Sequence, residues 1–207
     1  MKKSKIVLNR FVVVLIIMFC FSTVYSILLN FPCNFKVSQT SEGNAVIGKY
    51  IELPVPVMIV PKKIKGIDID IVGGGAFDWN SQLFVYVPNS IKKIEGGAFA
   101  NNQDLIYIYI SDSVEYIGAD SFAYCYSLTG VHMSRSIIKI DDLAFEHCDH
   151  LKFIKFPNGL KEIGNSAFYG CPLKNVNLPS SVEHIGHNAF VGIKINYSNS
   201  TKNSNDN

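Results

Sequence analysis

Charge is scarce in this sequence, and neither sign of charge dominates. Of the 207 residues, 17% are Asp, Glu, Lys or Arg, and the formal net charge at pH 7 is +2. A protein that binds nucleic acid carries a clustered or striped basic surface, whereas the densest basic run in the body of this chain is only Lys62, Lys63 and Lys65. Such a short run is typical of a solvated edge, so we expect no nucleic-acid partner.

Sequence motifs for catalysis are also missing. Neither G-x-S-x-G nor H-E-x-x-H occurs, and no two carboxylates recur at one position of the chain's pattern as a catalytic pair would. Two groups have a spacing that a metal could use: His147, Cys148 and His150, and His184 with His187. A zinc site needs four convergent ligands, and Cys148 belongs to a core position of the repeat described next, so solvated histidines are the better interpretation. We expect no catalytic residue, no metal and no cofactor.

The chain instead repeats one pattern: an aliphatic residue, two spacers, Ile, a short polar stretch, then Ala-Phe or Ser-Phe. One copy runs from Ile91 through Ile94 to Phe99. The phenylalanines that close the copies stand 22 or 23 residues apart, at positions 77, 99, 122, 145, 168 and 190. A fixed period of this length indicates a solenoid, in which each unit is too small to bury its own core and stacks on its neighbours. We therefore expect about six stacked units of 22–23 residues.

The residues after each Phe predict a strand that follows a turn. Their spacing places alternate apolar side chains on one face, so Leu105, Ile108 and Ile110 should point into the core. The glycines at 73–75 and at 96–97 hold the same place in two successive units. They therefore serve the turn of the repeat and do not form a phosphate-binding loop.

Three cysteines share one position of the repeat, three residues after the Phe. They are Cys125, Cys148 and Cys171, and Asn102 holds this position in an earlier unit. Neighbouring units lie about 4.8 Å apart, a distance that a disulfide can span, but the side chains should run parallel to each other. We favour a buried column of reduced thiols that bond to the turn backbone, over a disulfide between neighbouring units.

The repeated pattern resembles the BspA-like, or Treponema-type, leucine-rich repeat family over roughly residues 66 to 195. The resemblance implies a curved right-handed solenoid with a parallel β-sheet on its concave face. It also implies a non-enzymatic protein, because the better-known members are surface or secreted proteins that engage host proteins or other cells.

The N-terminus has the features of a secretory signal. Lys2, Lys3, Lys5 and Arg10 precede an apolar run from Phe11 to Phe21, and Val24 and Ser26 have the spacing of a cleavage site. The alternative is an uncleaved membrane anchor over residues 11–29, which is just long enough to cross a bilayer. Either way we expect the repeats to be secreted or at the cell surface. The expected organisation is a signal or anchor (1–26), a linker (27–45), the repeat domain (46–195, with 46–72 as its cap) and a disordered polar tail (196–207).

One face of the predicted sheet carries aromatic side chains that point away from the core. We expect Phe84, Tyr86, Tyr107 and Tyr109 to form a ligand surface, with His132, Phe153 and Lys155 at its margin. Aromatic residues also suit strands and pack across neighbours, so simple sheet packing is the competing interpretation. The expected partner is an extracellular or host protein, or a glycan. A structural role in a surface assembly, through packing of the solenoid, is the alternative function.

Overall fold

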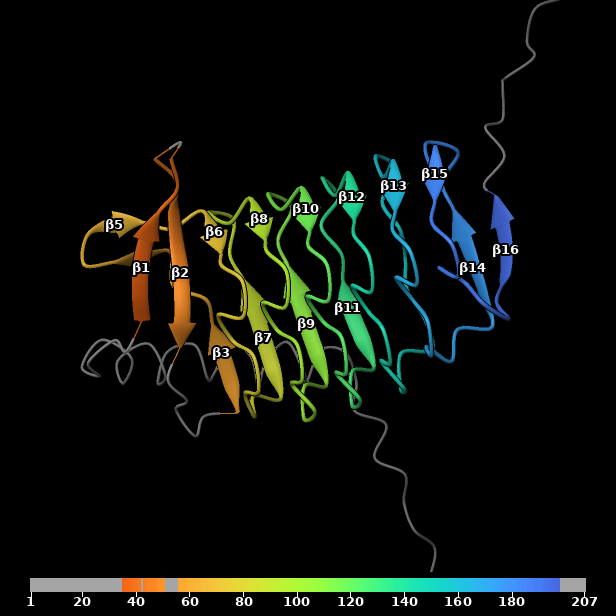
Figure 1. The fold of residues 1–207 in the computed structure, drawn as a ribbon, viewed down its shortest axis with the longest axis horizontal. Coiled ribbons are helices and arrows are strands. Elements are labelled where there is room, and N and C mark those ends of the chain that lie inside the picture. Colours follow the sequence, from red (N-terminus) through yellow and green to blue (C-terminus); the bar gives the residue numbers. More distant parts are fainter. Residues whose placement is uncertain (1–34, 42, 51–55, 198–207) are drawn as a thin grey trace, which may run out of the picture. The chain divides into compact units, whose positions relative to one another are not determined.

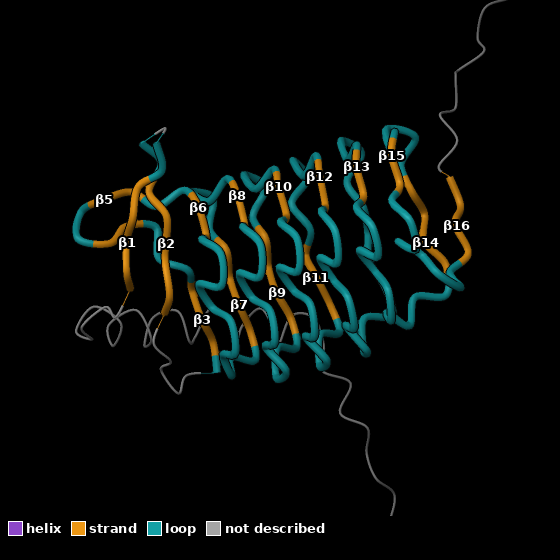
Figure 2. The backbone as a smooth tube through the Cα atoms, viewed as in Figure 1, coloured by secondary structure: helices purple, strands orange, loops and turns teal. Residues whose placement is uncertain are grey.

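A computed structural model of the chain describes residues 35–41, 43–50 and 56–197. Within these residues the chain forms short strands joined by turns and contains no helix (Figure 2). Figure 1 shows successive units stacked side by side in sequence order, most of them adding a strand to each of two sets of parallel strands. The predicted solenoid of about six turns with parallel sheets is therefore confirmed.

The longer strands come from the alternating segment after each Phe. Four of them form one parallel sheet in the order β11–β9–β7–β3, with bounds Gly130–His132, Tyr107–Ile110, Phe84–Val87 and Val57–Ile59. Two more, β14 (Asn175–Leu178) and β16 (Lys194–Tyr197), pair with each other. Residues 151–157 form no strand, so the two groups are separate. We call the side of the solenoid built by these segments the long-strand face.

The shorter strands contain the second aliphatic position of each repeat. They lie in the order β6–β8–β10–β12–β13–β15 of a second parallel sheet, with bounds Ile71–Val72, Lys93–Ile94, Tyr116–Ile117, Lys139–Ile140, Glu162–Ile163 and His184–Ile185. Their isoleucines pair in register, for example Ile117 with Ile94 and with Ile140. Ile94, Ile117 and Ile140 are buried, so this sheet closes the core opposite the long strands.

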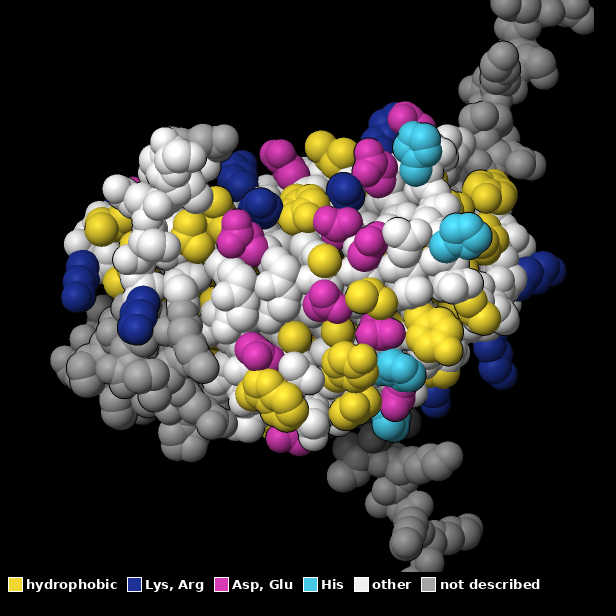
Figure 3. Space-filling view, viewed as in Figure 1, with side chains coloured by type: hydrophobic (Ala, Val, Ile, Leu, Met, Phe, Trp, Pro, Cys, Tyr) yellow, Lys and Arg dark blue, Asp and Glu magenta, His cyan; other side chains and the backbone are white. Residues whose placement is uncertain are grey.

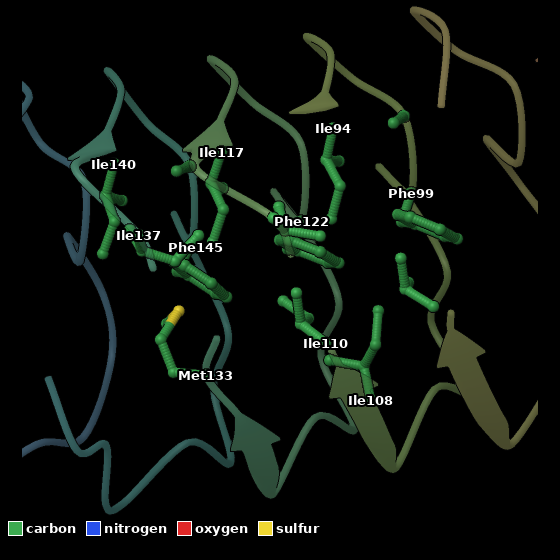
Figure 4. Close-up of a cluster of buried hydrophobic side chains, with 14 of the residues drawn as sticks. Ile94, Phe99, Ile108, Ile110, Ile117, Phe122, Met133, Ile137, Ile140 and Phe145 are labelled. Atoms are coloured by element: carbon green, nitrogen blue, oxygen red, sulfur yellow. The ribbon is translucent and has the colours of Figure 1, made fainter. Parts of the chain in front are cut away.

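The phenylalanines form one continuous stack through the core. The rings at 77, 99, 122, 145, 168 and 190 lie 5.0 to 5.4 Å apart, with planes within 12° of parallel. Figure 4 shows Phe122 between Ile117 on one side and Ile110 on the other. Five of the six rings are at most 1% exposed and Phe190, in the last unit, is 8% exposed. Burial of this stack is what neighbouring units contribute to each other.

Each unit turns through two residues in the left-handed region, two positions before and two positions after the Phe. Gly75 and Gly97 take the first position, with φ of 61° and 64°, which agrees with the turn role predicted for these glycines. The second position was not predicted, because Trp79, Tyr124 and His147 hold it in three units, with φ of 58°, 60° and 52°. Bulky residues adopt this conformation only under the constraint of surrounding structure. Stacking of the units therefore holds these residues in a left-handed backbone conformation that their side chains disfavour.

The N-terminal part of the described chain differs from the expected linker. Residues 27–45 were expected to form a linker, yet β1 (Phe35–Gln39) lies inside this range and pairs antiparallel with β2 (Ala45–Tyr50). β2 in turn pairs in parallel with β6. The polar run between β1 and β2 is a hairpin turn, in which Gly43 has a φ of 85° and donates its N–H to the Thr40 carbonyl at 3.0 Å. A small hairpin of β4 (Lys63–Ile64) and β5 (Ile67–Asp68) follows β3.

Both ends of the chain extend past the described residues. The predicted signal or anchor at 1–26 lies outside them, as does most of the polar tail, although β16 reaches Tyr197. None of the described residues belongs to a helix long and apolar enough to cross a membrane.

We predict that Phe145→Ala destabilises the solenoid by about 3–5 kcal/mol, because it removes a fully buried ring from the middle of the stack. Phe145 contacts a ring on each side, at 5.0 and 5.2 Å. The matched control is Phe153→Ala, since Phe153 is 82% exposed and its truncation should change the free energy of unfolding by less than about 0.5 kcal/mol. Urea denaturation followed by circular dichroism measures both. An unchanged midpoint for Phe145→Ala would refute the stacked core.

A second prediction concerns Ser121, which holds the position occupied by Ala98 and Ala144 in the neighbouring units. Its hydroxyl is fully buried and has no hydrogen-bond partner among the described residues. Ser121→Ala should therefore stabilise the protein by about 1 kcal/mol, because a buried polar group without a partner is costly. Ser134→Ala is the control, since the Ser134 hydroxyl is also buried but donates to the Val114 carbonyl at 2.6 Å. That variant should be destabilised, so equal shifts in the two variants would contradict the assignment.

Candidate binding surface

The outward side chains of the long strands form two rows that cross the sheet. Strand pairing places Val57, Phe84, Tyr107 and Gly130 in one row, the first row. It places Ile59, Tyr86, Tyr109 and His132 in the other, the second row. Buried and partly exposed residues alternate along β7 and β9, so the predicted division into inward and outward residues is confirmed there. Five of the seven expected ligand-surface residues thus come together on one sheet.

Three residues of the second row, Tyr86, Tyr109 and His132, form a continuous stack of rings. Tyr86 and Tyr109 have centroids 5.3 Å apart and planes 18° apart, and His132 lies 4.0 Å from Tyr109 at 13°. The His132 Nδ1 atom is 3.3 Å from the carbonyl oxygen of Ile110, which holds the imidazole against the neighbouring strand β9. Because both faces of Tyr109 are covered by neighbouring rings, this row offers ring edges and hydroxyl groups to a ligand.

The first row is less regular and more exposed. Tyr107 is 37% exposed, and its ring lies over the backbone of Gly130. A Cβ atom added at Gly130 would be only 2.9 Å from Cδ2 of Tyr107. Because Gly130 has no side chain, the ring of Tyr107 can lie directly over its backbone.

The two remaining predicted residues do not join these rows. Phe153 and Lys155 lie in the segment that forms no strand, although they hold the repeat positions of Gly130 and His132. Phe153 is 82% exposed, which is the highest value for a large hydrophobic side chain among the described residues. The structure thus places both residues beside the paired sheet and outside its hydrogen-bonded ladder.

An ion pair that the sequence did not indicate lies next to the second row. Arg135 donates to both carboxylate oxygens of Asp112, from its backbone N at 2.9 Å and its Nε at 2.7 Å. The hydrogen bonds from Arg135 hold the pKa of Asp112 below its usual value. Asp112 follows β9 and Arg135 follows β11, so 23 residues of sequence separate two groups that the solenoid brings into adjacent units. Arg135 remains 84% exposed at its side chain and can contact a ligand.

Other aromatic side chains occupy the turns after the Phe positions. Tyr124 and His147 stack at 5.6 Å, and His147 meets Tyr169 edge-on at 5.7 Å. Trp79, at 65% exposure, stands apart from them, because Asn101 holds the same turn position in the unit between. The turn aromatics form a broken series and are a weaker candidate than the two rows.

The cysteine column is buried and reduced in the structure, as predicted. Cys125, Cys148 and Cys171 are free, and their thiols donate to the carbonyl oxygens of Phe99, Phe122 and Phe145 at 3.1 to 3.3 Å. Asn102 makes the equivalent bond to the Phe77 carbonyl at 2.7 Å. Burial raises the pKa of the Cys125 thiol to about 12 and also raises that of Cys148. These thiols support the turns and are not placed for nucleophilic chemistry.

The charged side chains of the short-strand sheet are largely paired with one another. A shallow depression of about 210 Å³ is lined by residues that include Lys139, Asp141, Glu162 and His184. The Lys139 Nζ lies 3.6 Å from Asp141 and 3.4 Å from Glu162. Across the described part of the chain, no three His, Cys, Asp or Glu side chains converge as metal ligands. The depression therefore holds an internal ion-pair network.

Figure 3 shows one face of the molecule, on which hydrophobic and acidic side chains are interspersed. Lys and Arg side chains are scattered over the described part of this face and form no continuous patch.

Comparison with known proteins places the chain in a family. The family model for the BspA type leucine rich repeat region matches residues 70–196 in six copies, which confirms the resemblance seen in the sequence. A comparison with curated proteins found no match.

Solved structures share the fold. A leucine rich repeat protein of T. pallidum is 25% identical with a TM-score of 0.56, over 75% of this chain and 63% of that one. A leucine rich cell surface protein of Faecalibacterium prausnitzii A2-165 is 22% identical with a TM-score of 0.65, over 83% of this chain and 55% of that one. A leucine-rich repeat protein of Eubacterium ventriosum ATCC 27560 is 23% identical with a TM-score of 0.53, over 84% of this chain and 44% of that one. This chain therefore spans less than two thirds of each of these proteins.

We predict that the three column thiols resist alkylation in the native protein. With a pKa of about 12, roughly one Cys125 thiol in ten thousand is ionised at pH 8, against about a quarter for an exposed cysteine. The test uses a chain with Cys20→Ser and Cys33→Ser, so that only the column is counted, and follows iodoacetamide labelling by mass spectrometry with and without urea. Labelling of Cys148 at the same rate in both conditions, or a Cys125–Cys148 disulfide in the purified protein, would show the column to be wrong.

Proposed function

This chain belongs to the BspA-type leucine-rich repeat family, and we propose that it is a non-enzymatic binding module of the cell surface or extracellular space. In this proposal it recognises a partner protein through the outward side chains of β7, β9 and β11. The two rows, and in particular the stack of Tyr86, Tyr109 and His132, are the observation that supports it.

The rows have the composition and the rigidity of a recognition surface. Tyr is among the residues that most often dominate the binding energy of interfaces. The stack spaces the rings at 4.0 to 5.3 Å, and the buried alternate residues of the same strands anchor the backbone. Side chains that are ordered before binding lose less conformational entropy when a partner arrives. The surface is therefore suited to bind without rearrangement.

The orientation of the rings favours a protein over a glycan as the partner. A sugar ring typically lies flat against an exposed aromatic face, whereas in the second row the faces of Tyr109 are covered by Tyr86 and His132. Ring edges and phenolic hydroxyls remain, and these suit the hydrogen-bonding groups and apolar side chains of a polypeptide. Tyr107 and Phe153 add exposed apolar area beside the stack.

The proposed location rests on two observations. The sequence begins with a basic segment and an apolar run that are typical of a signal for export. One protein with the same fold is described as a leucine rich cell surface protein. Both support a secreted or surface-bound repeat domain.

We predict that a ladder variant, Tyr86→Ala, Tyr107→Ala and Tyr109→Ala, loses partner binding by about 100-fold or more, since each buried interface tyrosine contributes on the order of 1 kcal/mol or more. The matched control replaces three tyrosines of the turns, Tyr124, Tyr126 and Tyr169, by alanine. Immobilised wild type, ladder variant and control are compared by quantitative mass spectrometry of the extracellular proteins that each retains. Circular dichroism first shows that all three proteins are folded.

A supporting result is a protein retained by wild type and control and lost from the ladder variant. Equal retention by all three would assign the aromatic rows to sheet packing. Concentration-dependent self-association of the wild type, lost in the ladder variant, would instead support the structural role in a surface assembly. Analytical ultracentrifugation distinguishes that outcome.

A further inference from the structure

The long-strand face changes character along the solenoid. Its first segment in the described repeats, residues 81–90, contains no charged residue. Residues 150–160, 172–181 and 191–197, which build the same face in the last units, contain Lys152, Lys155, Lys174 and Lys194 and no Asp or Glu. All four lysines are exposed. The aromatic half of this face therefore continues into a half whose Lys, Arg, Asp and Glu residues are all lysines, which we call the cationic half.

These four lysines are unpaired among the described residues. Elsewhere, Lys63, Lys93, Lys139 and Lys161 each lie within ion-pair distance of a carboxylate. No described Asp or Glu lies within that distance of any lysine of the cationic half. Arg135, at the junction of the two halves, is held by Asp112 yet 84% exposed at its side chain. The cationic half thus has no internal counter-charge.

The repeat places two of these charges in line with the aromatic rows, Lys155 in the second row and Lys194 in the first, whereas Lys152 and Lys174 hold the position one residue before the first row. Lys155 holds the repeat position of His132, 23 residues later, and Asn177 holds it in the next unit. Lys194 pairs in register with Asn175 across β14 and β16. With units about 4.8 Å apart, the distance from the unit of Tyr86 to that of Lys194, five units on, is about 24 Å. An extended peptide of about seven or eight residues covers this length.

We propose that the cationic half binds an acidic stretch of the partner protein, so that one extended segment lies along the face with apolar or aromatic residues on β7 and β9 and Asp or Glu over the lysines. This inference rests on the proposed function, since the aromatic rows hold the other end of the segment. Complementary charge sets the direction of the segment and speeds its encounter with the face. The order of the two halves along the face, aromatic and then cationic, thereby selects one orientation of the partner.

The probes are three polyanions of different chemistry: a copolymer of glutamate and tyrosine, polyglutamate and heparin. Each is titrated against the immobilised full chain by biolayer interferometry at low and high salt. The lysine variant carries Lys155→Glu and Lys174→Glu. The matched control carries Lys62→Glu and Lys65→Glu, which reverse two exposed charges outside the cationic half. All four substitutions are at exposed positions, and circular dichroism verifies the fold.

The copolymer should bind the wild type and the control alike, and the lysine variant about tenfold or more weakly. Its affinity should fall as salt rises, because exposed charges are screened. Polyglutamate should bind more weakly than the copolymer, since it lacks the aromatic groups. Equal binding of the copolymer by wild type and lysine variant would overturn the proposal. So would lysine-dependent binding of heparin without binding of the copolymer, which would mark the face as a glycan site.

The same titrations separate this inference from the proposed function. If polyglutamate and the copolymer bind equally and both depend on the lysines, the acidic stretch is supported and the aromatic rows are not. If no polypeptide probe binds while the ladder variant still loses its extracellular partner, the proposed function stands and the acidic stretch is refuted.

Discussion

The stack of phenylalanine rings is the interaction on which the rest of the structure depends. Rings from successive units repeat at 5.0 to 5.4 Å, close to the spacing of neighbouring strands in a sheet. The backbone follows the same repeat, since the N–H of Phe122 donates to the carbonyl of Ala144 in the next unit at 2.8 Å. Every other position of the unit must then recur at this spacing, so each position becomes a column along the solenoid.

The columns explain features that look unrelated in the sequence. Cys125 and Asn102 share a column because a thiol and an amide can both donate to the carbonyl of the Phe in the preceding unit. Trp79 and His147 hold a left-handed turn position, where Gly170 stands in a later unit, because stacking fixes the backbone whatever the side chain. The outward columns of the long strands have no such internal task. Their residues are therefore available for recognition. They are aromatic in the early units, and in the late units they are mostly polar and include Lys155 and Lys194.

Much of the fold followed from periodicity and alternation. The spacing of the phenylalanines predicted the stacked units, and the alternation along residues 107–110 predicted which side chains are buried. The hairpin of β1 and β2 was missed, because the polar run between its strands has the composition of a linker and only the pairing with β6 shows that it belongs to the solenoid. Phe153 and Lys155 were placed in the correct column, but the absence of a strand at 151–157 could not be read from a segment with the same pattern as its neighbours.

The sequence by itself determined the repeat, the core positions and the residues that face outward, because these depend on a local spacing that recurs in every unit. Only the tertiary structure decided how the outward residues meet. The stacking of His132 on Tyr109, the ring of Tyr107 over Gly130 and the bond of Arg135 to Asp112 each join residues about 23 positions apart. The lysines of the cationic half are likewise dispersed in the sequence, so they form no basic run. They share one surface because each turn of the solenoid returns the chain to the same face.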